Sequence, residues 1–416
     1  MGRPTQPLAP PCGGCKAAPG LRAARVLGIF LRLGCTSFGG PIAHLGFFRA
    51  EFVTRRRWLG EAEYADLVAL CQSLPGPASS QVAACIGLMR AGLSGLFAAW
   101  LGFTLPSAAA LILFAYGTGR FAGLAAAPWL HGLKIVAVAV VAQALWGMAR
   151  TLCPDRLRAT IAIAMAVLTL ALPSAPGQIG AIILGGLIGW RWIREPPKPL
   201  PATATATLSV SLPRPLALAA LFSFAALLAI LPLAASASGS HTVALISRFY
   251  RAGALVFGGG HVVLPLLQQA VVPPGWIGNN LFLAGYGAVQ AVPGPLFTFA
   301  AYLGTAMRPA PNGWLGGLIC LVAIYFPSFL LLIGVLPFWD QLRRAAAIQS
   351  ALRGVNAAVV GLLLAALYTP VWTSAITTRG DFAIGIAAFL LLAFWRAPPW
   401  LVVLLGAAAA QFVALA

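Results

Sequence analysis

The stretch FLRLGCTSFGGP at residues 30–41 returns in the second half of the chain as FYRAGALVFGGG at residues 249–260. A second stretch follows in the same order, because QSLPGP at 72–77 returns as QAVPGP at 290–295. Three further matches keep that order: WLG at 58–60 with WIG at 276–278, FTLPS at 103–107 with IYFPS at 324–328, and GLKIVAVAVV at 132–141 with ALRGVNAAVV at 351–360. Ordered matches at a nearly constant spacing indicate an internal duplication. The sequence therefore predicts two homologous halves.

The composition decides the class of protein. Of 416 residues, 60% are hydrophobic and only 8% are charged, and the mean hydropathy is +0.90. A soluble domain carries about 25% charged residues, so this chain has too little polar surface to face water. The apolar fraction also excludes a disordered chain. The net charge of +19 is dispersed between apolar runs, which argues against a nucleic-acid partner. We predict an all-α polytopic membrane protein in contact with lipid.

A hydrocarbon core of about 30 Å requires about 20 apolar residues in each helix. By that measure the candidate spans are 26–48, 64–91, 93–117, 129–150, 159–174, 177–193, 215–235, 244–268, 281–307, 314–338, 349–369, 382–396 and 398–415. Segments 64–91 and 281–307 are equally compatible with re-entrant hairpins, so we expect about 10–13 transmembrane helices.

The spans divide the chain into four parts. Residues 1–25 form a disordered tail, 26–193 the first repeat, 194–243 a linker with one connecting span, and 244–416 the second repeat. With six spans in each half and one span between them, equivalent helices lie seven spans apart and run in opposite directions. That is an inverted repeat, which is common in secondary transporters. The distribution of Lys and Arg predicts a cytoplasmic N-terminus.

Four short motifs are expected to break helices within the membrane. Gly frees the backbone dihedrals, and Pro removes a hydrogen-bond donor. Irregular backbone at membrane depth is tolerated where protein or water surrounds it, and a half-helix that starts there directs its N–H groups at an anion. The alternative is close helix packing through small residues. The break residues are Phe38, Gly39, Gly40, Pro41, Pro75, Gly76, Pro77, Gly258, Gly259, Gly260, Pro293, Gly294 and Pro295.

Arginine pairs supply the candidate charge for an anionic substrate. Arg32 and Arg251 are repeat equivalents and precede the glycine breaks, so we expect them to share a cavity with the breaks. Arg90 and Arg308 are also equivalent, but snorkelling at a helix end explains them better. The further candidate substrate ligands are Ser37, Gln72 and Gln290 together with the break glycines.

Coupling to protons would need titratable groups near the breaks. The candidates are His44, Glu51, Glu63, Asp66 and His261. The acids are not repeated, because Glu51 corresponds to Ala270 and the others correspond to uncharged residues. An alternative for the acids is a solvated loop that balances Arg55–Arg57. Cys12 and Cys15 form a single C-x-x-C motif, which is weak evidence for a metal, and we expect neither metal nor cofactor.

Longer stretches carry a family resemblance. SFGGPIAHLGFF at 37–48, SLPGPASSQ at 73–81, FGGGHVVLPLL at 257–267 and GYGAVQAVPGPLFTFAAYLG at 285–304 resemble the two-domain members of the chromate ion transporter family. The resemblance implies an inner-membrane carrier that exports chromate, a dianion similar to sulfate, and confers chromate resistance. It also implies that the membrane potential or a proton gradient drives transport.

Three functions follow as hypotheses. The first is a secondary transporter that exports chromate, with sulfate as a competitor and a homodimer as a possible assembly. The second is a carrier for sulfate or another oxyanion without preference for chromate. The third is an intramembrane enzyme in which His44 works with Glu51 or Asp66 as acid and base. Two symmetric sets of breaks argue against the enzyme, because a catalytic site gains nothing from them.

Overall fold

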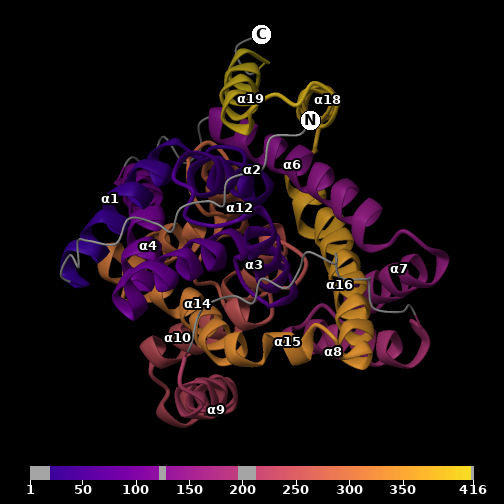
Figure 1. The fold of residues 1–416 in the computed structure, drawn as a ribbon. Helices are drawn as coiled ribbons and strands as arrows, with labels where there is room; N and C mark the ends of the chain where they lie inside the picture. Colours follow the sequence, from indigo (N-terminus) through magenta and orange to yellow (C-terminus); the bar gives the residue numbers. More distant parts are fainter. Residues whose placement is uncertain (1–18, 121–127, 195–211, 414–416) are drawn as a thin grey trace, which may run out of the picture.

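The computed structural model describes residues 19–120, 128–194 and 212–413, and within these ranges the chain forms helices and no strands (Figure 1). Most of the predicted N-terminal tail, with Cys12 and Cys15, lies outside the described residues. Its last part does not fit the prediction, because helix α1 already begins at Pro19.

The helices of the first half are α1 (Pro19–Thr36), α2 (Gly40–Phe48), the π-helical η1 (Arg49–Arg55), α3 (Glu61–Ser73), α4 (Ala78–Arg120), α6 (Pro128–Leu152), α7 (Arg156–Ala171) and α8 (Ala175–Trp192). Helix α9 (Arg214–Ser238) connects the halves. The second half contains α10 (His241–Ala254), η2 (Gly260–Val262), α11 (Val263–Val271), α12 (Asn279–Val289), η3 (Leu296–Thr298), α13 (Phe299–Ala306), α14 (Gly313–Val335), η4 (Leu336–Phe338), α15 (Trp339–Leu342), α16 (Ala346–Ala366), η5 (Leu367–Trp372), α17 (Thr373–Ala375), α18 (Arg379–Ala393) and α19 (Pro399–Val413).

The polytopic helical class is confirmed. Among the described residues, five helical stretches are long and apolar enough to cross a membrane, namely Ala78–Thr118, Pro128–Leu152, Arg214–Ser238, Gly313–Leu342 and Ala346–Ala375. Several other predicted spans are divided into shorter helices. The span predicted at 26–48 is α1 followed by α2, and the span at 244–268 is α10 followed by η2 and α11.

The two suspected re-entrant segments are each split at the Pro-Gly-Pro motif. The segment at 64–91 consists of α3 and the first part of α4, and the segment at 281–307 consists of α12, η3 and α13. Helix α4 then reverses at Ala91 and Gly92, whose backbone is not helical. Gly87 and Gly95 lie against each other across this reversal, as Gly304 and Gly316 do between α13 and α14. The two halves therefore fold alike at this point.

The halves exchange their C-terminal helices. Helix α6 of the first half packs on α18 and α19 of the second, and α16 of the second half packs on α7 and α8 of the first (Figure 1). Backbones touch at Gly132 with Gly406 in one contact and at Gly189 with Gly354 in the other. Since α6 and α16 carry the matched stretches at 132–141 and 351–360, these contacts are reciprocal. Reciprocal contacts are the mark of a two-fold relationship.

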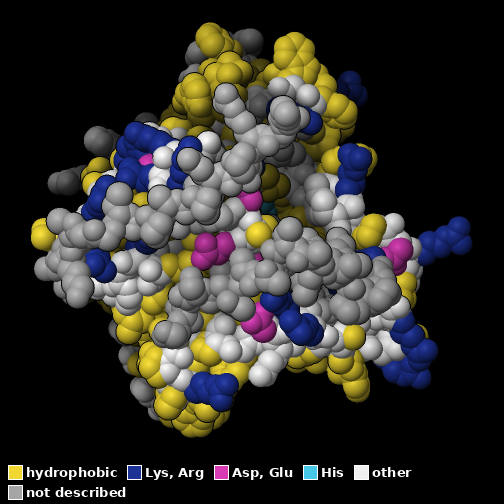
Figure 2. Space-filling model, in the orientation of Figure 1, with side chains coloured by type: hydrophobic (Ala, Val, Ile, Leu, Met, Phe, Trp, Pro, Cys, Tyr) yellow, Lys and Arg dark blue, Asp and Glu magenta, His cyan; other side chains and the backbone are white. Residues whose placement is uncertain are grey.

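The connecting helix lies at the edge of the molecule. Helix α9 packs on α10 and α14, and only 11% of its most apolar stretch is buried. Figure 2 shows hydrophobic side chains gathered over this edge and over α18 and α19 at the opposite edge. Such apolar surface suits the lipid that surrounds a membrane protein.

Candidate functional site

The glycine breaks end α1 and α10 because the backbone takes conformations that favour glycine. Gly39 and Gly40 have φ of 100° and 76°, and their equivalents Gly258 and Gly259 have φ of 74° and 145°. A side chain at such φ values is strained. The predicted breaks therefore exist in both halves, and α2 starts directly after the first one with no side-chain cap.

Each Pro-Gly-Pro break is held by the opposite half. The amide of Gly76 donates to the carbonyl of Val256 at 2.7 Å, and the amide of Gly294 donates to the carbonyl of Ser37 at 3.0 Å. Ser37 and Val256 are themselves repeat equivalents. These two hydrogen bonds are therefore repeat equivalents, and each half donates one of them to the other half.

A cavity of about 540 Å³ lies where the breaks of the two halves meet. Its wall includes the first glycine break and the second Pro-Gly-Pro region. The break residues and predicted ligands along it are Phe38, Gly39, Gly40, Pro41, His261, Gln290 and Gly294. Pro41 also approaches Gly260, its own repeat equivalent, so that the ring carbon Cγ lies 3.5 Å from where a Cβ of Gly260 would stand. A residue that meets its own equivalent lies near the two-fold axis. We call this space the central cavity.

Polar groups line part of the central cavity. His261 Nδ1 lies 2.7 Å from the hydroxyl of Tyr286, and its ring borders the cavity together with Gln143, Gln290 and Arg396. The first turn of α2 is also exposed there, where N–H groups at a helix start have no helical partner. One cation, one imidazole, two amides and a helix start together make a wall that can bind an anion.

The predicted arginine pair is placed differently from our expectation. Arg32 Nη2 lies 2.7 Å from Glu51 Oε2, and it borders a separate surface cavity. Glu51 also contacts Arg56 at 2.6 Å and Arg55 at 3.2 Å. A carboxylate with 7% of its side chain exposed needs such partners, and none of the break residues borders the cavity at Arg32. Arg251 borders a third cavity, so the arginines and breaks do not share one.

The acids proposed for proton coupling make structural contacts. Asp66 accepts from Arg343 Nη1 at 2.9 Å and from the indole of Trp339 at 3.1 Å, which links α3 to α15. Glu63 accepts from the amide of Gly60 at the start of α3. Glu51 lies beyond the predicted 26–48 span. Burial raises its pKa, but hydrogen bonds from Arg56 and Arg55 and the charge of Arg32 bring that pKa below the usual value.

Two further candidates lie away from the central cavity. His44 is fully buried, with Nδ1 3.3 Å from Ser79 Oγ and Nε2 3.1 Å from the carbonyl of Ser37. Gln72 is exposed at the end of α3. Sequence reasoning missed Arg396 and Gln143. A single Gln inside the apolar span at 129–150 was a usable signal, whereas Arg396 resembled an ordinary cation at a helix end.

Comparisons with known proteins agree with this architecture. A family model described as chromate transporter matches residues 24–190 and 243–411. The chromate transport protein of Cupriavidus metallidurans is 25% identical over 377 residues, which cover 88% of this chain and 87% of that protein. The probable chromate transport protein of Synechococcus elongatus is 26% identical, with 88% of each chain covered. The chromate transport protein of Pseudomonas aeruginosa is 28% identical and covers 80% of this chain and 77% of its own. No solved structure matches.

Proposed function

The chain belongs to the chromate transporter family, and we propose that it is a secondary transporter that exports chromate across the inner membrane and thereby confers chromate resistance. Family membership supports a transporter rather than an enzyme. The observation that carries the proposal is the central cavity, which each half lines with a different break. A site at the contact of two related halves can be opened to either side by rocking one bundle of helices against another.

The wall of the central cavity supports a dianion as substrate. The N-terminal turn of α2 supplies N–H groups and the positive end of a helix dipole. Arg396 supplies the full positive charge, in place of the Arg32 and Arg251 that the sequence suggested. Gln143 and Gln290 supply amide donors that orient a tetrahedral oxyanion.

His261 is the group that we assign to proton coupling. It borders the central cavity and contacts the Tyr286 hydroxyl, so it can titrate next to the substrate. The acids are less suitable, because Glu51 is held ionised by arginines and Asp66 is bound to Arg343. We place the N-terminus in the cytoplasm and the two halves in opposite orientations.

Chromate uptake into inverted membrane vesicles tests the proposal. Arg396→Gln is expected to raise the apparent KM for chromate about tenfold, the effect of losing roughly 1.4 kcal/mol of charge-assisted binding. Arg191→Gln is the matched control, because Arg191 is exposed on α8 and stacks on Trp192. Vesicles with the wild-type chain that take up no more chromate than empty vesicles would refute the proposal.

A sulfate carrier is the second candidate function. Sulfate has the charge and shape of chromate, and the donors around the central cavity recognise both features. Competition between labelled sulfate and chromate in the same vesicles separates the two functions. A lower apparent Kd for sulfate than for chromate would make sulfate the substrate.

A further inference from the structure

Both halves have an arginine at the same repeat position, but only the first half has a carboxylate beside it. Arg32 is bound to Glu51 at 2.7 Å. Their repeat equivalents are Arg251 and Ala270. The positive charge is therefore present in both halves, but the negative charge that neutralises it is present only in the first.

The surroundings of the two arginines are equivalent as well. The cavity at Arg32 is bordered by Leu33, Thr36, Phe47 and Glu51, and the cavity at Arg251 is bordered by their equivalents Ala252, Leu255, Leu266 and Ala270. The two spaces therefore share four pairs of equivalent lining residues, although the space at Arg32 is the larger, about 360 Å³ against about 10 Å³. Glu51 presents a carboxylate to the first, and the methyl group of Ala270 leaves the second without one.

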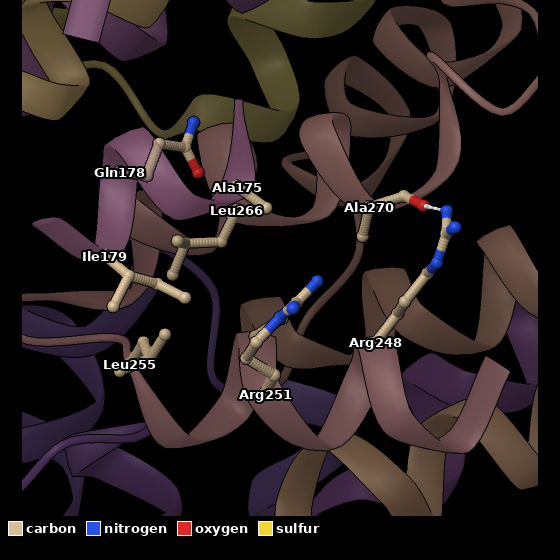
Figure 3. Close-up of a pocket in the computed structure, with 9 residues that line it drawn as sticks. Ala175, Gln178, Ile179, Arg248, Arg251, Leu255, Leu266 and Ala270 are labelled. Atoms are coloured by element: carbon tan, nitrogen blue, oxygen red, sulfur yellow. Dashed lines mark hydrogen bonds between the residues drawn. The ribbon is translucent and has the colours of Figure 1, made fainter. Parts of the chain in front are cut away.

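Arg251 extends into this second cavity (Figure 3). The neighbouring Arg248 borders the same cavity, where its Nη1 donates to the carbonyl of Ala270 at 2.5 Å and its guanidinium covers the ring of Trp276 at 4.3 Å. In the part of the chain that the structure describes, neither arginine has an ion pair with an acid. An unpaired, half-buried cation is costly. Arg248 adds to the positive electrostatic potential of this cavity.

The geometry points to a small monovalent anion, such as chloride, bound at Arg251 in the position that a carboxylate occupies in the first half. The cavity is small, with a volume of about 10 Å³, which favours a compact ion over a large one. This site is distinct from the central cavity, because the two spaces share no lining residue. The first turn of α8, with Ala175 and Gln178, closes the other side of the cavity and adds the positive end of a helix dipole.

Thermal unfolding of the purified full chain tests the site. Unfolding is measured in sodium chloride and in sodium gluconate at the same ionic strength, since gluconate is too large for the cavity. We expect chloride to raise the Tm of the wild type by several degrees, because a ligand that binds only the folded state stabilises it. Ala270→Glu brings its own carboxylate and should show a high Tm in both salts with no response to chloride.

Arg251→Gln should also lose the response to chloride, but it should not have the high Tm that is expected for Ala270→Glu. Equal wild-type Tm values in the two salts would overturn the proposal, as would a full chloride response in Ala270→Glu. Should Ala270→Glu fail to fold, binding of radioactive chloride decides, with one chloride per wild-type chain and none per Arg251→Gln chain expected. Arg396→Gln alters the central cavity and should keep the chloride response, so this result is independent of the transport proposal.

A lipid phosphate is the competing source of negative charge at this site. Nanodiscs of phosphatidylglycerol and of phosphatidylcholine, both in gluconate, separate the two sources. We expect the same Tm in both lipids and the same rise on addition of chloride. A chain that phosphatidylglycerol stabilises and chloride does not would assign the site to a lipid headgroup and overturn the assignment to a small free anion.

Discussion

The backbone amide of Gly76 donates a hydrogen bond to the carbonyl of Val256, 2.7 Å away in the other half of the chain. The equivalent bond joins Gly294 to Ser37 at 3.0 Å. Unpaired amides are expensive at membrane depth, so each half satisfies a group that the other half exposes at its break. The wall of the central cavity is therefore complete only when both halves are folded together.

Substitution of the break glycines should disturb this arrangement strongly. Gly76 has φ of 123°, and a Cβ there would stand 2.5 Å from Ser328 Oγ; Gly294 has φ of 107°, and a Cβ there would stand 2.8 Å from Ser107 Oγ. Gly76→Ala and Gly294→Ala should each lower the free energy of unfolding by about 2 kcal/mol or more, from backbone strain and the clash together.

Gly147→Ala is the matched control, because Gly147 lies inside α6 with open space around it. Alanine is the better helix former, so this variant should be as stable as the wild type or more so. Thermal unfolding and gel filtration in detergent measure both effects. Equal Tm values for Gly76→Ala, Gly147→Ala and the wild type would show that the clash at the break does not exist.

The two-half organisation and the break positions could be predicted from the sequence, because a duplicated motif is visible wherever it occurs. The matches at 30–41 and 249–260 placed both pairs of glycines with positive φ correctly. The exchange of helices between the halves could not be predicted, because a repeat shows which residues are alike and not which half each one contacts. The contacts of Ser107 and Ser328 with the Pro-Gly-Pro break of the other half were therefore not predicted.

The charged part of the site was predicted less well. Arg32 and Arg251 were expected near the substrate because both precede a break. Instead, Arg32 forms an ion pair with Glu51, and Arg251 borders a separate cavity. Ion pairs between residues far apart in the sequence depend on tertiary structure. Arg396 follows α18 in a part of the chain without a matched motif, and the packing of α18 and α19 against α6 brings it to the central cavity.

We expect Glu51→Ala to destabilise the chain. An added anion should restore part of the lost stability. Removing Glu51 leaves Arg32, Arg55 and Arg56 without their shared carboxylate. Because Arg32 and Arg55 are 48% and 61% exposed, we expect a loss of about 1–3 kcal/mol, less than that for a fully buried pair. Formate, the smallest carboxylate, should raise the Tm of Glu51→Ala by more than it raises that of the wild type. An equal effect of formate on both proteins would contradict this account.

The same cluster predicts a dependence of stability on pH. The pKa of Glu51 is lower in the folded chain than its ordinary value of 4.5, so the folded state prefers the ionised form. The resulting stabilisation is complete above about pH 4.5 and is lost as the pH falls through the lowered value. Glu51→Gln should remove this part of the acid sensitivity. Thermal unfolding of both proteins between neutral and acidic pH measures it, and parallel curves would argue against it.

His261 and His44 should respond differently to substitution. His261→Gln removes a titratable group beside the central cavity, so the dependence of chromate uptake on pH should flatten. His44→Gln affects a fully buried ring between α2 and the start of α4, and it should lower the Tm while leaving the shape of the pH profile unchanged. Uptake rates in vesicles across a range of pH make the comparison. A flattened profile for His44→Gln alone would transfer the coupling role to His44.

The orientation of the two halves gives the last prediction. Reciprocal contacts require a two-fold axis, but they fit an axis in the membrane plane as well as one along its normal. Gly60 and Gly278 distinguish the two cases, because they are repeat equivalents, both are exposed, and both immediately precede a helix, α3 and α12. At both glycines the space within 4 Å of where a Cβ would stand is open, so cysteine fits at each.

In a chain without its native cysteines, Gly60→Cys and Gly278→Cys should react with a membrane-impermeant maleimide from opposite sides of the membrane. The physical reason is parity, since six predicted crossings in each half and the single connecting helix α9 give seven crossings, an odd number, from one site to the other. Labelling of intact cells and of inverted vesicles measures the side for each site. Labelling of both sites from the same side would place the axis along the membrane normal, and alternating access by inverted halves would then be wrong.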